Sequence, residues 1–152
     1  MSANHESTKP ATTTHAGSCH CGAVRYEVDL DLSKGGSRCN CSICTKLGCV
    51  GTLLKPNELR LLAGEEHLGA YVWGGRVSQR YFCKQCGVYC FGRGHLEMLG
   101  GDFASVNLNT IDDVDPNDLK IVHWDGRHDN WQAGPGVAPF PIFAQAAAPR
   151  VA

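Results

Sequence analysis

The chain has 152 residues, which suits a single domain with a buried core, and its 43% apolar and 19% charged residues are ordinary for a globular protein. Its formal net charge of −1 provides no overall field that would attract nucleic acid or an anionic membrane. The sequence contains no run of about 18 apolar residues, so no membrane span is expected.

The first half of the chain predicts short strands separated by turns. Residues 1–16 are polar and lack the apolar stretch of a secretory signal, so we expect a disordered leader. Residues 23–30 alternate between apolar and polar side chains, which is the pattern of a half-buried strand. The following segments predict a loop at 31–38, one helical turn at 41–48 that ends at Gly48, and strands at 49–54 and 58–64.

The second half continues in the same way. Residues 67–73 and 77–83 predict a hairpin joined through Gly74 and Gly75. Further strands are expected at 88–94, 103–110 and 119–124, with an acidic turn at 112–118. Residues 132–152 are rich in proline and predict an extended arm or loose tail. Helix signals are scarce, so the fold class is mainly β.

Nine cysteines are the unusual feature of the composition. An odd number without a secretion signal argues against a disulfide framework, and it favours metal binding in a reducing, cytoplasmic setting. Seven of them fall into three clusters, which are Cys19-His20-Cys21-Gly22, Cys39-Asn40-Cys41-Ser42-Ile43-Cys44 and Cys83-Lys84-Gln85-Cys86-Gly87.

The clusters divide naturally into four cysteines and three. Cys19, Cys21, Cys83 and Cys86 would make a closed structural zinc site, because zinc takes four thiolates in a tetrahedron. Cys39, Cys41 and Cys44 would hold a second zinc and leave one position free. The glycine after each cysteine pair suits turns that need a positive φ.

Other interpretations of the cysteines stay open at this point. One zinc with mixed ligands and spare cysteines would fit the spacing, and Cys83 and Cys86 could form a redox pair, although their surroundings predict a hairpin rather than a βαβ unit. Cys49 and Cys90 lie in apolar, strand-like runs, so we expect both to be small buried core residues.

The three segments GSCHCGAVRYE, RCNCSICTKLG and RYFCKQCGVYCF together resemble the glutathione-dependent formaldehyde-activating enzymes, a family that also includes centromere protein V-like proteins. The resemblance covers about residues 17–131, and HWDGRHDNW is similar to the family's closing segment. It implies a β-tent fold of stacked antiparallel sheets. It also implies a structural zinc on Cys19, Cys21, Cys83 and Cys86 and a catalytic zinc on Cys39, Cys41 and Cys44.

The resemblance further implies a carbon–sulfur lyase that joins glutathione to formaldehyde and gives S-hydroxymethylglutathione, a detoxification reaction. The expected partners are therefore a small aldehyde and a thiol such as glutathione, with two zinc ions per chain. Zinc ionises a bound thiol near neutral pH and polarises a carbonyl, so the three-cysteine site suits this chemistry. A non-catalytic zinc-stabilised binding module is the alternative, and a zinc or thiol buffer is a weaker one.

Several other side chains are candidates for the site, although each has a plainer interpretation. The histidines could act as a general base or a fourth metal ligand, and they could equally lie on the surface: His67, His95, His123 and His128. The arginines could bind carboxylates or belong to a solvated face: Arg76, Arg80 and Arg93. The tryptophans favour packing: Trp73, Trp124 and Trp131.

Overall fold

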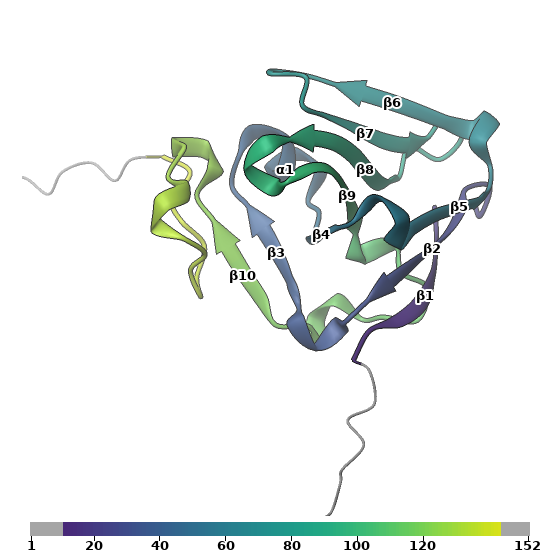
Figure 1. Ribbon diagram of the computed structural model, residues 1–152, viewed down its shortest axis with the longest axis horizontal. Coiled ribbons are helices and arrows are strands. Elements are labelled where there is room, and N and C mark those ends of the chain that lie inside the picture. The colour runs from purple at the N-terminus through teal and green to yellow at the C-terminus, as the bar shows by residue number, and fades with distance from the viewer. Residues whose placement is uncertain (1–10, 144–152) are drawn as a thin grey trace, which may run out of the picture.

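A computed structural model of the protein describes residues 11–143, and these form ten strands and one α-helix (Figure 1). A three-stranded antiparallel sheet has the order β1 (Thr13–Ser18), β2 (Arg25–Leu30), β5 (Leu59–Ala63). A seven-stranded sheet has the order β10 (Ile121–Trp124), β3 (Gly36–Cys39), β4 (Gly51–Leu54), β9 (Gly101–Asn107), β8 (Tyr89–Leu96), β7 (Ser78–Cys83), β6 (Leu68–Val72).

The seven-stranded sheet is antiparallel except where β10 pairs with β3 in parallel. The single α-helix, α1 (Ser42–Leu47), follows β3. Short 3-10 turns connect the strands at Leu32–Lys34, Pro56–Glu58, Glu65–His67, Glu97–Leu99, Leu108–Thr110, Pro116–Asp118, Gly126–His128 and Trp131–Ala133. The prediction of a mainly β fold is confirmed. In the described part of the chain, no helix has the length and apolar character needed to cross a membrane.

The core lies between the two sheets and contains the alternating residues of β2. Tyr26 and Val28 are fully buried, and Leu30 is 5% exposed. The Tyr26 ring meets Phe91 of β8 edge to face, with ring centroids 5.5 Å apart. Burial of one side of β2 against the larger sheet explains why this strand was visible as an alternation in the sequence.

Two predictions about the first forty residues are wrong. Residues 13–16 belong to β1, although a disordered leader was expected there; residues 1–10 lie outside the described part. The loop expected at 31–38 contains a 3-10 turn and the start of β3. Neither strand carries an apolar alternation: β1 is a polar strand at the edge of its sheet, and β3 is a short strand that pairs with β10 at four positions and with β4 at one.

The proline-rich segment after residue 131 turns back onto the sheet. Gly136 pairs with His123 of β10 through two backbone hydrogen bonds of 2.8 and 2.7 Å. Figure 1 shows this segment beside β10, at the edge of the molecule opposite β5. The described part of the expected arm, up to residue 143, therefore packs against β10, whereas residues 144–152 lie outside the described part.

Candidate metal centres

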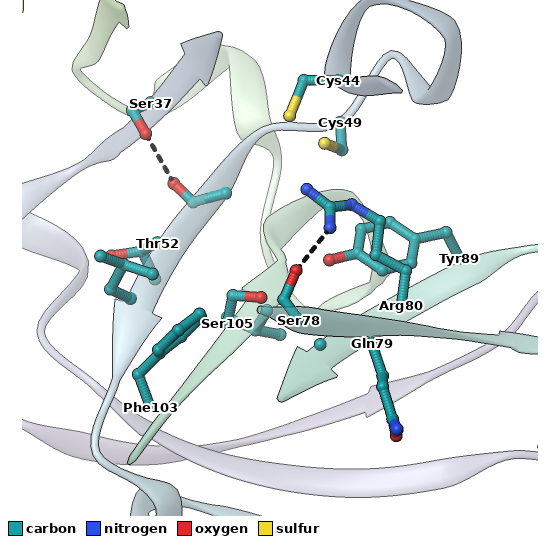
Figure 2. A pocket seen from close by; sticks show the side chains of 14 residues that line it. Ser37, Cys44, Cys49, Thr52, Ser78, Gln79, Arg80, Tyr89, Phe103 and Ser105 are labelled. Atoms are coloured by element: carbon teal, nitrogen blue, oxygen red, sulfur yellow. Dashed lines mark hydrogen bonds between the residues drawn. The ribbon is translucent and has the colours of Figure 1, made fainter. Parts of the chain in front are cut away.

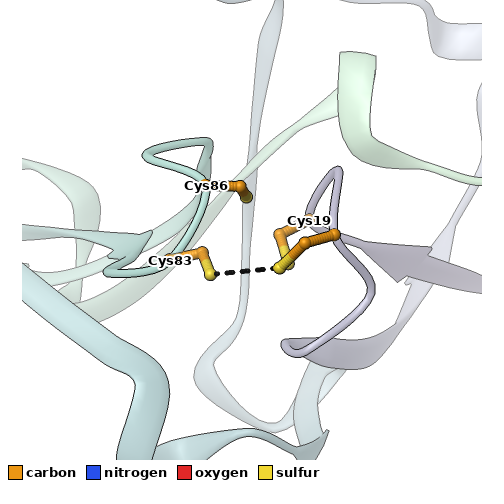
Figure 3. Close-up of side chains that lie close together, drawn as sticks. Cys19, Cys83 and Cys86 are labelled. Atoms are coloured by element: carbon orange, nitrogen blue, oxygen red, sulfur yellow. Dashed lines mark hydrogen bonds between the residues drawn. The ribbon is translucent and has the colours of Figure 1, made fainter.

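The first centre is built from the two turns that contain cysteine pairs. Cys19 and Cys21 lie in the β1–β2 connection, Cys83 ends β7, and Cys86 lies in the β7–β8 turn. Their four sulfur atoms all lie within 4.8 Å of one another. Figure 3 shows the two turns meeting, with Cys19 facing Cys83 and Cys86.

The distances between these sulfur atoms fit a tetrahedral metal. The Cys19 and Cys21 Sγ atoms are 3.6 Å apart, and those of Cys21 and Cys83 are 3.7 Å apart. A zinc ion at about 2.3 Å from each of four sulfurs would separate them by about 3.8 Å. Cys19 and Cys83 are buried at 3% and 0% exposure, so the centre is closed on that side.

The two turns favour the thiolate form at Cys19 and Cys86, whose pKa values are lowered. Gly22 and Gly87, which follow the cysteine pairs, have φ values of 79° and 77°, as the turn interpretation predicted. The Val24 amide donates a hydrogen bond of 3.3 Å to Cys19 Sγ. The pKa of the Cys86 thiol falls to about 6: burial raises it, but the amides of Cys21 and Val88 and neighbouring thiols outweigh that effect. The Ala23 amide favours the Cys21 thiolate as well, but desolvation and the neighbouring thiols outweigh it and raise the pKa of Cys21 to about 11.

The second centre lies where β3 meets α1. Cys39 ends β3, Cys41 is the N-cap of α1, and Cys44 lies in the helix, so the short helix returns the third thiol to the first two. Their sulfurs also lie within 4.8 Å of one another. Among the described residues, the group comprises these three side chains, so a metal bound here would keep a position for another ligand.

Mutual repulsion limits the charge that this second group can carry without a cation. The pKa of the Cys41 thiol is lowered because Cys39 and Cys44 hydrogen-bond to it, and that of Cys39 is raised well above its usual value by Cys41 and Cys44. One negative charge is therefore favoured among three thiols. A divalent cation would remove this repulsion, so the donor set fits a thiolate-binding metal such as zinc.

The segment after β10 holds the second centre in place. The Asn40 side chain donates to Asp125 Oδ1 at 2.7 Å and accepts from the Arg127 amide at 2.9 Å. Gly126 approaches so closely that a Cβ there would lie 2.5 Å from Cys39 Sγ. Asp125 is 6% exposed, and its pKa is lowered by the hydrogen bond from Asn40, with help from His128 and Asn130 despite some desolvation.

A pocket of about 220 Å³ opens beside the second centre (Figure 2). Cys44 and Cys49 lie at one end of it, and Arg80 of β7 extends toward them. Cys49 is thus a pocket residue, so its expected core role is wrong, whereas Cys90 is fully buried as predicted. The pKa of the Cys49 thiol is lowered to about 7 by its hydrogen bond with Cys44, and Arg80 adds to this effect against desolvation.

The histidine candidates lie outside both cysteine groups. His67 contacts Gln85 beside the first centre at 3.2 Å, and His95 bonds to Asp102 and Glu97 on the surface. His128 Nδ1 donates to Asp125 Oδ1 at 2.7 Å, and His123 shares a second, smaller cavity with Cys39.

The three arginine candidates lie in different surroundings. Arg93 donates to the backbone oxygens of Pro56 and Leu59, Arg76 lies exposed in the β6–β7 turn, and Arg80 alone of the three lines the pocket. Of the tryptophans expected to pack, Trp124 and Trp131 contact each other with ring centroids 6.0 Å apart, although Trp131 is 50% exposed. Trp73 is 40% exposed, so the packing expected of it is wrong.

Sequence reasoning missed the residues that surround the second centre. Asn40, Asp125 and Arg127 were unassigned, although the polar run WDGRHDN was a signal of a built turn. Tyr89 and Ser105 come from β8 and β9, and only the strand pairing brings them to the pocket. No local pattern could have identified them.

Comparisons with known proteins identify relatives with provisional functional names. Proteins from Halomonas elongata and Talaromyces marneffei, both provisionally named glutathione-dependent formaldehyde-activating enzymes, are 37% and 34% identical over 78 and 98 residues. The matches cover 46% and 60% of this chain, and 50% and 52% of the relatives. The chain thus spans about half the length of these curated relatives.

A solved structure gives a longer match. The crystal structure of a Rhodobacter sphaeroides protein superimposes with a TM-score of 0.62 at 34% identity, over 72% of this chain and 98% of that one. The sequence pattern of the glutathione-dependent formaldehyde-activating enzyme family matches residues 14–124, which span β1 to β10 and include all seven clustered cysteines. The chain therefore belongs to the glutathione-dependent formaldehyde-activating enzyme family.

Proposed function

We propose that the protein is a zinc-dependent enzyme that adds a thiol, with glutathione as the first candidate, to formaldehyde or another small aldehyde. The observation that carries the proposal is the group of three thiols at Cys39, Cys41 and Cys44, which opens through Cys44 into a pocket. A purely structural role would require only the closed first centre. The names of the relatives and the family support the same reaction.

In this proposal the two centres have different roles. Cys19, Cys21, Cys83 and Cys86 hold a structural zinc, and Cys39, Cys41 and Cys44 hold the second zinc at the reaction site. The second zinc, when bound, would lower the pKa of a substrate thiol, so that the thiol is ionised at neutral pH. The pocket walls from β4, β7, β8 and β9 orient the substrates and limit the water around them.

The reaction balances without a redox partner. The thiol sulfur forms a new bond to the aldehyde carbon, the second bond of the carbonyl becomes a lone pair on oxygen, and the proton of the thiol ends on that oxygen. The product is a hemithioacetal, and the reverse step breaks a carbon–sulfur bond, which is lyase chemistry. In a cell this reaction would serve formaldehyde detoxification.

The cysteines also bear on where the protein works. All nine are free thiols in the structure, and both proposed centres need reduced sulfur. We therefore place the protein in a reducing compartment, with the cytoplasm as the candidate.

Exchange spectroscopy by NMR on labelled formaldehyde and glutathione tests the proposal. Since the two compounds combine without a catalyst, the protein should speed the exchange and leave the equilibrium position unchanged. Cys41→Ser should return the rate to the background while the first centre keeps its metal. An exchange rate at background with the fully metal-loaded protein would exclude formaldehyde, and the same result with larger aldehydes would favour a non-catalytic binding module.

A further inference from the structure

The pocket beside the second centre is larger than formaldehyde requires. Its volume is about 220 Å³, whereas formaldehyde has only two heavy atoms and one water molecule occupies about 30 Å³ of liquid. The pocket therefore has room for a substrate considerably larger than formaldehyde. Hydroxyl groups line it on several strands, from Ser37, Thr52, Ser78, Tyr89 and Ser105.

One positive charge lies in this pocket. Among the lining residues that the structure describes, Arg80 alone has a formally charged side chain, and none is an aspartate or glutamate. Its Nη1 donates to Ser78 Oγ at 2.9 Å, which holds the guanidinium within the pocket. Among residues 11–143, no carboxylate lies within ion-pair distance of it. A half-buried guanidinium in this position is ready to accept an anionic group.

The strands aim Arg80 at the second centre. Ser78 and Arg80 lie on the same face of β7, and the intervening Gln79 points away from the pocket (Figure 2). Gly92 is paired with Arg80 across the β7–β8 ladder. A Cβ at Gly92 would lie 2.7 Å from Ser105 Oγ and 3.5 Å from the Tyr89 hydroxyl, so this glycine keeps the floor of the pocket open.

We infer that Arg80 is a specificity-determining residue that binds a carboxylate of the thiol substrate while the sulfur lies at the second centre. This inference rests on the proposed function, because it assumes that a thiol binds beside Cys44. It adds that thiols with a carboxylate are preferred over neutral thiols of similar size. A planar guanidinium can bind a carboxylate through two parallel hydrogen bonds, which gives direction as well as attraction.

A second role for Arg80 has to be separated from this one. Three thiolates around a divalent cation carry a net charge of −1, and Arg80 could simply offset that charge. In that case its removal would also weaken the binding of neutral thiols, through the sulfur that they share with the charged ones. A substrate carboxylate, by contrast, makes Arg80 matter only for thiols that carry one.

Binding measurements on the zinc-loaded protein distinguish these roles. We would determine by calorimetry the Kd of 3-mercaptopropionate and of its methyl ester, which lacks the negative charge, for the wild type, Arg80→Gln and Arg76→Gln. Arg76 is exposed in the β6–β7 turn and serves as the matched control. The two thiols differ in sulfur acidity, but this difference is the same for each protein and cancels when the Kd ratios are compared.

For each protein we compare the ratio of the Kd of the ester to the Kd of the carboxylate. We expect this ratio to be about tenfold higher in the wild type and in Arg76→Gln than in Arg80→Gln, as for one charge-assisted contact. Equal ratios in all three proteins would overturn the inference, and a uniform loss for both thiols in Arg80→Gln would assign Arg80 to charge compensation. If neither thiol binds any of the metal-loaded proteins, the proposed function itself fails.

Discussion

Asn40 stands between the first two thiols of the second centre, and all its hydrogen-bonding groups are occupied. Its amide donates to the Trp124 oxygen at 3.2 Å, and its own carbonyl accepts from Arg127 Nε at 2.9 Å and Thr45 Oγ1 at 3.0 Å. Its side chain binds Asp125 and the Arg127 amide. Cys39 and Cys41 are thereby fixed relative to β10, so the three thiols are positioned before any metal arrives.

Replacement of Asp125 should loosen this arrangement. In Asp125→Ala the side-chain nitrogen of Asn40 loses its 2.7 Å acceptor and keeps only the Phe140 oxygen at 3.5 Å. We expect the affinity of the second centre for zinc to fall about 10- to 100-fold, as for other groups that orient metal ligands. Competition with a chromophoric chelator measures this loss, and Asp113→Ala, at an exposed position, is the control. Equal zinc affinities in Asp125→Ala and wild type would show that Asn40 does not need this anchor.

At the scale of single elements, strands were predictable where one face is buried and missed where it is not. The alternation over β2 gave a correct strand because Tyr26 and Val28 face the core. β1 contains mostly small and polar side chains at a sheet edge, and it exists through its backbone pairing with β2. Such pairing is decided by the neighbouring strand, so the local sequence of β1 has no signal for it.

In the candidate site, too, some features have a local sequence signal and others do not. Local spacing identified the cysteine pairs and the triad, which the structure also brings together. Joining the first pair to the one 62 residues later relied instead on the preference of zinc for four ligands. The pocket was not predictable, since it combines Cys44 after β3 with Arg80 on β7 and Ser105 on β9. Only the strand order of the large sheet places these residues together.

The end of α1 depends on Gly48, which ends the helix as predicted. Gly48 has φ 61° and donates its amide to the Cys44 oxygen at 3.0 Å. Gly48→Ala should lower the free energy of unfolding by about 1 kcal/mol, because other residues rarely adopt this conformation. Urea denaturation of the zinc-loaded protein measures the change. Gly75→Ala, at a turn position that does not itself have a positive φ, should have little effect, and equal losses in both variants would refute the explanation.

At the scale of the whole molecule, the two centres connect different parts of the fold. The first joins the β1–β2 turn of the small sheet to the β7–β8 turn of the large one, although Cys21 and Cys83 are 62 residues apart. A metal there would bind the folded arrangement only, so its binding energy would contribute to folding. The second lies at the β10–β3 side of the large sheet and faces the pocket, where loss of metal should affect reactivity more than folding.

The division of seven cysteines into a closed centre and an open one is the central claim, and the zinc content of the purified protein tests it most directly. Elemental analysis combined with native mass spectrometry should give two zinc ions per wild-type chain and one in Cys39→Ser, Cys41→Ser and Cys44→Ser. Cys49→Ser, which changes a pocket thiol outside the three-cysteine group, should keep two. One zinc per wild-type chain, with no loss in the three variants, would contradict the account.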